Sequence, residues 1–137
     1  MGKIKRVYIA GALTPHGLHS ASPAIDYLIN VRTMVRVALE ALEAGFDPFV
    51  PALDGLFWLC APEGTTITEP MIKRYSKSWL EACDAVLLVP EWQASGGTKA
   101  EIEFARRKGI SVFVNLETMV KYNGGKDEPS DNSETNA

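Results

Sequence analysis

The sequence contains few of the residues that build metal sites or disulfides. It has two cysteines and two histidines among 137 residues, and no CxxC pair accompanies the closely spaced His16 and His19. We therefore expect no metal site and no other cofactor. Cys60 and Cys83 are interpreted as buried or half-buried free thiols. A run of 18 or more apolar residues is also absent, so the sequence predicts no membrane-spanning helix.

The sequence also has little excess of one charge sign over the other. The net charge is −3, and residues 123–137, with one lysine and four acidic residues, account for all of it. The nearly neutral remainder does not favour DNA or RNA as a partner. Residues 1–11 are basic and then apolar, but the apolar run is too short for a signal peptide. We expect a cytoplasmic protein.

Large apolar side chains are missing from residues 123–137. Such a segment cannot offset its loss of conformational entropy by burial. The sequence therefore predicts one folded domain over residues 1–122, which is long enough to bury a core of its own. Residues 123–137 are expected to form a disordered acidic tail.

Apolar segments with strand spacing and helix spacing alternate along the rest of the chain. The expected strands are 6–10, 46–50, 85–89 and 111–114, and the expected helices begin at Pro23, at Pro70 and near Thr98. Pro48 marks the second strand as an edge strand, and residues 51–69 are expected to form a long irregular loop. The alternation predicts an α/β fold: a doubly wound, Rossmann/flavodoxin-like parallel sheet of four to five strands, with helices on both faces.

Ligands of such sheets bind at the carboxyl ends of the strands, where the strand order reverses. The turn Ser95-Gly96-Gly97-Thr98 lies at this rim and precedes a helix. Its glycines let backbone N–H groups converge on a phosphate or carboxylate; an ordinary connection is the other interpretation. The sequence has no G-x-G-x-x-G, G-K-[ST] or G-x-S-x-G motif. This argues against dinucleotide, P-loop and serine-hydrolase chemistry.

Glu101 follows this turn, and local sequence leaves its role open. Thr98 and Glu101 match the capping box T-x-x-E, in which the carboxylate bonds only to the backbone of Thr98. The alternative is a nucleophile or base that faces the rim. Tyr8 is either a core residue or a phenol hydrogen-bonded to a rim carboxylate. Asp84, at the amino end of a strand, is expected to have a structural role. Trp58 is a candidate for stacking on a planar base, although aromatic core packing is the commoner role.

Two segments resemble the nucleoside 2-deoxyribosyltransferase family, which includes the deoxynucleoside 5′-monophosphate N-glycosidases and relatives of uncharacterised function. The first is Tyr8-Ile9-Ala10-Gly11, which is similar to the opening strand motif of the family. The second runs from Cys83 to Glu101 and is similar to the family pattern of an aspartate, a strand, a loop and SxGT-x-x-E. A helix and a strand follow, so the resemblance spans residues 6–114.

The resemblance implies a mechanism. Glu101 matches the nucleophilic glutamate, which would attack the anomeric carbon of a nucleoside or nucleoside 5′-monophosphate and form a glycosyl-enzyme intermediate. Water would then give hydrolysis, and a second base would give transfer. Tyr8 matches a tyrosine that orients the glutamate. The substrate-binding positions at the strand end and at the sugar 5′ end are Gly11, Ser95, Gly97 and Thr98.

One position departs from the family pattern. Where the family often has an aspartate that contacts the base or passes a proton, this sequence has Ser76. A serine hydroxyl is a poor general acid, so another group would have to protonate the base. Asp54, in the 51–58 segment, is the candidate. Asp54, Trp58 and Ser76 complete the expected substrate-binding residues.

Three functions remain open at this point. The first is cleavage or transfer of an N-glycosidic bond through Glu101. The second is a non-catalytic module that binds a nucleotide or sugar phosphate, with Glu101 only capping its helix. The third is a phosphoribosyl hydrolase that acts on a modified base. The resemblance also implies a homodimer or larger homo-oligomer.

Overall fold

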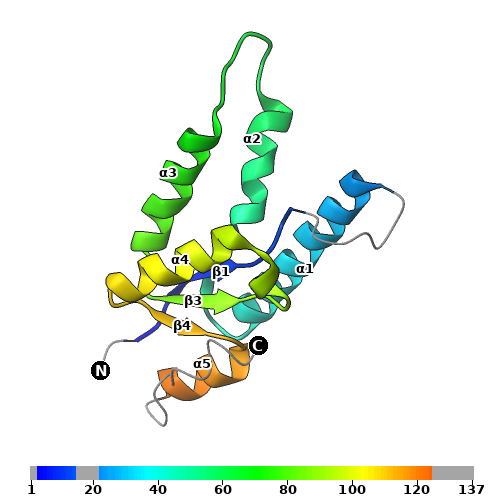
Figure 1. Cartoon of the computed structure of the whole chain (residues 1–137). Coiled ribbons are helices and arrows are strands. Elements are labelled where there is room, and N and C mark those ends of the chain that lie inside the picture. The colour runs from blue at the N-terminus through cyan, green and yellow to red at the C-terminus, as the bar shows by residue number, and fades with distance from the viewer. Residues whose placement is uncertain (1–2, 15–21, 125–137) are drawn as a thin grey trace.

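A computed structural model of the chain describes residues 3–14 and 22–124 (Figure 1). His16, His19 and the predicted tail beyond residue 124 lie outside the described residues. Four strands form one parallel sheet in the order β2-β1-β3-β4. They are β1 (Arg6–Ala10), β2 (Asp47–Phe49), β3 (Ala85–Leu88) and β4 (Ser111–Phe113). The predicted α/β class and parallel sheet are confirmed, and β2, which contains Pro48, is an edge strand.

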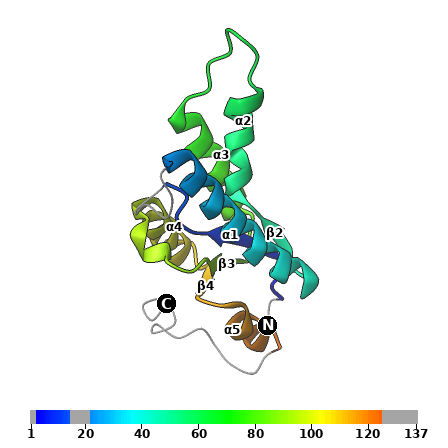
Figure 2. The same ribbon diagram turned by 90° about the vertical axis from the view of Figure 1, so that its right-hand side faces the viewer.

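Helices cover both faces of the sheet, as predicted. α1 (Pro23–Glu43) and α5 (Leu116–Asn123) pack on one face, and α3 (Glu69–Glu81) and α4 (Gly96–Arg107) pack on the other (Figures 1 and 2). Because successive side chains of a strand point to opposite faces, Val7 and Ile9 of β1 join the α1 core. Tyr8 and Ala10 join the core under α3 and α4. This alternation decides which helices can reach the Tyr8 phenol.

The segment 51–69 is more ordered than its sequence suggested. The expected irregular loop is wrong for residues 51–60, which form the short helices η1 (Pro51–Asp54) and α2 (Gly55–Cys60). Residues 61–68, before α3, are irregular as predicted. α3 begins one residue before the predicted Pro70, since the Thr68 hydroxyl accepts a hydrogen bond from the backbone N–H of Met71. Together α2 and α3 project beyond the sheet as an arm (Figure 1).

A hydrogen bond joins the N-terminal and C-terminal ends of the domain. α5 extends to Asn123, one residue past the predicted boundary, and the Asn123 side-chain oxygen accepts a hydrogen bond of 2.7 Å from the backbone N–H of Ile4. Within the described residues, no helix has the length and apolar content that a bilayer crossing requires.

The strand order reverses between β1 and β3, since β2 lies outside β1 and β4 lies outside β3. The two central strands come very close at their carboxyl ends. A Cβ atom placed on Gly11 would lie 2.6 Å from the Cβ of Val89, so this approach requires glycine at position 11. Open parallel sheets bind ligands at such a point.

Candidate functional site

A buried phenol and a carboxylate meet beside this switch point. Tyr8 of β1 has no exposed surface, and its hydroxyl donates a hydrogen bond of 2.5 Å to Oε2 of Glu101 on α4. The two residues are 93 positions apart in the chain. The structure thus confirms the predicted contact between Tyr8 and a rim carboxylate, and the short distance is typical of a charge-assisted hydrogen bond.

The capping-box interpretation of Glu101 is wrong. The N-cap of α4 is Ser95, whose hydroxyl accepts a hydrogen bond of 3.0 Å from the backbone N–H of Thr98. Thr98 is therefore inside the first turn, and it is buried. Glu101 lies a further turn along the helix, too far to bond the N-cap backbone, so its carboxylate is directed to the rim and not used to start the helix.

A second carboxylate faces the same space. Asp54 at the end of η1 is buried, and its Oδ2 accepts a hydrogen bond of 2.7 Å from the Ser76 hydroxyl on α3. Ser76 therefore positions a carboxyl group that comes from a different segment of the chain. The contact brings together two of the predicted substrate-binding residues.

Burial dominates the electrostatics of the group. Desolvation raises the pKa of Glu101 to about 7, and the negative charge of Asp54 contributes to this rise, while the hydrogen bond from Tyr8 opposes it. Burial also raises the pKa of Asp54, against the effect of the Ser76 hydrogen bond. The pKa of Tyr8 is raised by burial and then by the charge of Glu101, so the phenol stays protonated at neutral pH. Burial is therefore the main cause of the raised pKa of both carboxyl groups.

Two pockets meet at Glu101. The first, here called the apolar pocket, has a volume of about 510 Å³ and holds the polar groups of Tyr8, Asp54, Ser76 and Glu101 at one side. Its remaining lining is largely apolar or aromatic and includes Tyr27, Trp58, Ile72, Leu80 and Phe104. Three cationic residues, Lys73, Lys77 and Arg107, also line it. Few convergent polar groups in an apolar cavity are typical of a small-molecule site.

The second, here called the glycine pocket, has a volume of about 480 Å³ and contains the first turn of α4. Gly11, Ser95, Gly97 and Thr98, all predicted as substrate-binding residues, line it. Glu101 is common to both pockets. The first N–H groups of a helix have no acceptor within the helix and carry positive potential, so this end of the site suits an anion.

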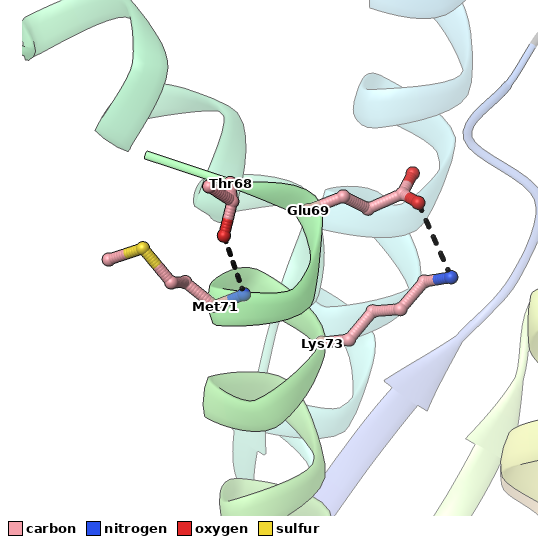
Figure 3. A network of polar contacts seen from close by, with 4 residues as sticks. All are labelled: Thr68, Glu69, Met71 and Lys73. Carbon is pink, nitrogen blue, oxygen red and sulfur yellow. Dashed lines mark hydrogen bonds and ion pairs between the residues drawn. The ribbon is translucent and has the colours of Figure 1, made fainter. Parts of the chain in front are cut away.

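A lysine also borders both pockets. Lys73 of α3 lies 3.5 Å from the carboxylate of Glu69, and both side chains are mostly exposed. Figure 3 shows the two side chains extending from one side of α3, while Thr68 and Met71 close the start of the helix on the other. An exposed pair of this kind is weak, so the ammonium group can exchange its partner for a ligand anion.

A family model matches residues 5–114, and its description is "Domain of unknown function (DUF4406)". The chain belongs to the DUF4406 family. All residues that line the two pockets of the DUF4406 domain lie within the match. A comparison with curated proteins gave no match.

The remaining sequence predictions for the DUF4406 domain concern structural residues. Asp84 has the expected structural role, because its Oδ2 accepts hydrogen bonds of 2.9 Å from the backbone N–H groups of Lys5 and Arg6. Both cysteines are free, but Cys60 is exposed and only Cys83 is buried. Among residues 3–14 and 22–124, no group of three or more potential ligands is placed to hold a metal ion.

Two site residues were not predicted from the sequence. Lys73 is four positions after Glu69, a spacing so common in exposed helices that it carries no functional signal. Tyr27 of α1 was not predicted either, because the apolar spacing of that helix indicates packing against a core and carries no signal of a site. Its hydroxyl stands 2.9 Å from where a Cβ on Gly55 would lie, so it packs against the start of α2.

Proposed function

We propose that this chain cleaves or transfers the N-glycosidic bond of a nucleoside or nucleoside 5′-monophosphate, with Glu101 as the nucleophile. The observation that supports this most strongly is the hydrogen bond from buried Tyr8 to Glu101 where the two pockets meet. Glu101 and Tyr8 are also the residues that the sequence resemblance implies as the nucleophile and the group that orients it. As a reaction of nucleotide metabolism, it would take place in the cytoplasm.

The proposed first step needs Glu101 in its ionised form. A carboxylate oxygen attacks the anomeric carbon from the face opposite the base, a C–O bond forms, and the C–N bond breaks. With a pKa of about 7, roughly half of the Glu101 groups are ionised at neutral pH. The raised pKa also makes the carboxylate more basic than an exposed one. Tyr8 holds one oxygen of the carboxylate and leaves the other available for attack.

Asp54 is proposed as the acid that assists the leaving base. The electrons of the breaking C–N bond stay on the base nitrogen, and the Asp54 proton neutralises the base as it leaves. The raised pKa of Asp54 favours the protonated form that this step requires. Ser76 fixes the carboxyl group by its hydrogen bond to Oδ2. Water activated by the resulting Asp54 carboxylate would hydrolyse the glycosyl-enzyme, whereas a second base would complete transfer.

The two pockets suggest how the substrate would lie. The base fits the apolar pocket, where Trp58 and Tyr27 offer aromatic surface next to Asp54. The sugar would then lie over Glu101, and its 5′ end would point into the glycine pocket. The first turn of α4 and Lys73 would stabilise a 5′-phosphate there.

The test compares Glu101→Gln with the wild-type chain on a panel of nucleosides and nucleoside 5′-monophosphates. Base release is measured by chromatography, and the glycosyl-enzyme is sought by intact-protein mass spectrometry after rapid acid quenching. We expect Glu101→Gln to lose base release by about 10³-fold or more. The matched control is Glu103→Gln, because Glu103 lies on the same helix, is exposed and pairs with Arg107. Equal base release by the wild-type chain and Glu101→Gln would contradict the proposal.

A non-catalytic nucleotide-binding module is the second candidate. It is favoured by Ser76, which stands where the family that the sequence resembles often has an aspartate. Saturable binding of a nucleoside 5′-monophosphate in calorimetry, without base release or a glycosyl-enzyme, would support this candidate in place of the first. A panel with ribose, deoxyribose and modified bases also tests the phosphoribosyl hydrolase alternative.

A further inference from the structure

The outward face of α1 carries large apolar side chains that the domain does not bury. These side chains are 40–57% exposed, and they are Ile25, Leu28, Val35, Leu39 and Leu42. The adjoining side of the helix supplies Met34, Ala38 and Ala41 to the core against the sheet. Figure 2 shows α1 across the near side of the molecule, with no described element in front of it. Exposed apolar patches of this kind mark interaction surfaces.

The spacing of these residues is that of a helix pair. Together with Arg32 they occupy positions 25, 28, 32, 35, 39 and 42, with alternating steps of three and four residues. This is the spacing of the a and d positions in a heptad repeat, which form the contact line of two packed helices. A helix that only covers a sheet needs one apolar stripe, and α1 has two.

The outward stripe is complementary to itself when reversed. The positions mirror one another about the midpoint between Thr33 and Met34, so an antiparallel copy places Ile25 against Leu42 and Leu28 against Leu39. In the central pair, Arg32 meets Val35. We propose that α1 forms an antiparallel helix pair with α1 of a second copy of this chain, in a twofold-symmetric dimer. The proposal does not depend on the function proposed for the site.

Other occupants fit this face less well. Residues 125–137 have no large apolar side chain, and residues 1–2 and 15–21 have too few of them to cover the stripe. A membrane surface would favour a basic border on the apolar face. On α1, however, Arg32 and Arg36 are balanced by Glu40 and Glu43. A neutral, apolar, self-complementary face favours a second copy.

The length of the stripe is sufficient for a specific contact. From Ile25 to Leu42 the helix rises about 26 Å, and the apolar surface along it is interrupted only at Arg32. α2 and the preceding η1 can extend the contact, since Tyr27 packs against Gly55, and Leu53 of η1 and Leu56 of α2 are exposed. An interface of standard size buries about 800 Å² on each partner, so both helices are expected to contribute.

The first test measures the mass of the full chain in solution by sedimentation equilibrium over a range of concentrations. We expect a dimer for the wild-type chain and, for Leu39→Glu, a dissociation constant raised by about 100-fold, because a charge would enter the apolar contact. The matched control is Val120→Glu on α5, where the side chain is 45% exposed but outside the stripe. Circular dichroism checks that each variant is folded. A monomeric wild-type chain, or a Leu39→Glu dimer as tight as the wild type, would overturn the proposal.

The second test exploits the central pair. In the proposed register residue 35 lies next to Arg32 of the second copy, so Val35→Glu gains an ion pair and remains dimeric. Val35→Lys places like charges together and dissociates. The same degree of dissociation in both variants would overturn the antiparallel register.

Cross-linking and vesicles separate the remaining arrangements. In a Cys60→Ser background, the Leu28→Cys chain mixed with the Leu39→Cys chain is expected to form a mixed dimer with a short bismaleimide. Leu28→Cys alone should not, since its two copies would lie about 16 Å apart along the axis. Efficient cross-linking of Leu28→Cys to itself, or sedimentation of monomers with vesicles of phosphatidylcholine and phosphatidylserine, would overturn the proposal.

Discussion

The hydroxyl of Ser76 donates a hydrogen bond of 2.7 Å to the carboxylate of Asp54, 22 residues earlier in the chain. α3 thus holds a carboxyl group that comes from η1. In the proposed reaction, η1 supplies the acid, Asp54, and α3 supplies Ser76, which orients it. The absence of an acidic residue at position 76 is then compatible with catalysis.

Replacement of Asp54 tests two proposed effects of this residue: proton donation to the leaving base and the influence of its charge on the pKa of Glu101. Asp54→Asn removes the proton donor, so kcat for ordinary nucleosides should fall by about 10²–10⁴-fold. Purine nucleosides methylated at N7 should be affected far less, because their base leaves without being protonated. When Asp54 is ionised, its negative charge raises the pKa of Glu101. The substitution removes this charge, so the limb of kcat/KM that reports Glu101 should move to lower pH.

The measurement is a set of pH–rate profiles for both substrate types. Ser76→Ala is the matched control, because it keeps the acid and removes only its hydrogen bond; we expect a smaller loss of kcat. Equal losses on the ordinary and the methylated substrates would show that Asp54 does not protonate the base.

Replacement of Tyr8 should shift the pH dependence in the opposite direction. The hydrogen bond from Tyr8 lowers the pKa of Glu101, so its loss in Tyr8→Phe raises that pKa above about 7. The acid limb of kcat/KM should therefore move to higher pH, with activity partly recovered at pH 9. Phenylalanine fills nearly the same volume, so the core is retained. An unchanged acid limb, measured on a folded variant, would contradict an orienting role for Tyr8.

The buried carboxylate should also make stability depend on pH. Below the ordinary pKa of 4.5, Glu101 is protonated in both the folded and the unfolded chain. Between about 4.5 and 7 the unfolded chain loses this proton first, so the free energy of unfolding falls as pH rises, by on the order of 3 kcal/mol. Above the folded pKa this contribution is fully lost.

Glu101→Gln removes the ionisable group, so its stability should exceed that of the wild-type chain at pH 8 and equal it near pH 4. Urea unfolding followed by circular dichroism at a series of pH values measures the difference. Glu103→Gln, an exposed neighbour on α4, should retain the wild-type pH dependence. A Glu101→Gln chain that is less stable than wild type at pH 8 would show that the carboxylate stabilises the fold.

Replacement of Lys73 should distinguish a 5′-phosphate from a 5′-hydroxyl. Lys73 borders both pockets and is paired with an exposed glutamate, Glu69. Lys73→Ala should therefore raise KM for a nucleoside 5′-monophosphate by about tenfold and leave KM for the parent nucleoside almost unchanged, since a charge-assisted hydrogen bond contributes about 1.5–3 kcal/mol. Lys121→Ala, on α5 across the sheet, is the control. A similar rise for both substrates would exclude a phosphate contact.

The sequence was sufficient for the sheet and for one half of the site. The carboxyl ends of adjacent parallel strands meet at one rim, and β1 pairs with β3, the strand that precedes α4. Tyr8 and Glu101 could therefore be predicted to meet. The capping box failed for a local reason. Ser95, three residues earlier, is an equally good cap, and the two glycines after it can adopt the first turn of the helix.

For the other half of the site, the sequence analysis named Asp54, Trp58 and Ser76 as candidates, but their arrangement could not be predicted. Asp54 and Ser76 meet only because η1 and α2 turn the chain back toward α3, and the short apolar segment 51–60 has too few helical repeats to reveal this. Similarly, the cavity that Trp58 shares with Lys73 depends on how the projecting arm packs. Long-range packing is not encoded in local spacing.

The two carboxylates belong to parts of the sheet with different neighbours. Asp54 follows β2, a three-residue strand paired on one side only, whereas Glu101 follows β3, which is paired on both sides. Peripheral segments open more easily than central ones, so a partial opening would withdraw the acid and leave the phenol–carboxylate pair in place. Hydrogen exchange that is as slow at Asp54 as at Ile102 would contradict this. If the edge strand opens in this way, the chain has an inactive form that is still mostly folded and differs from the active form at one edge of the sheet.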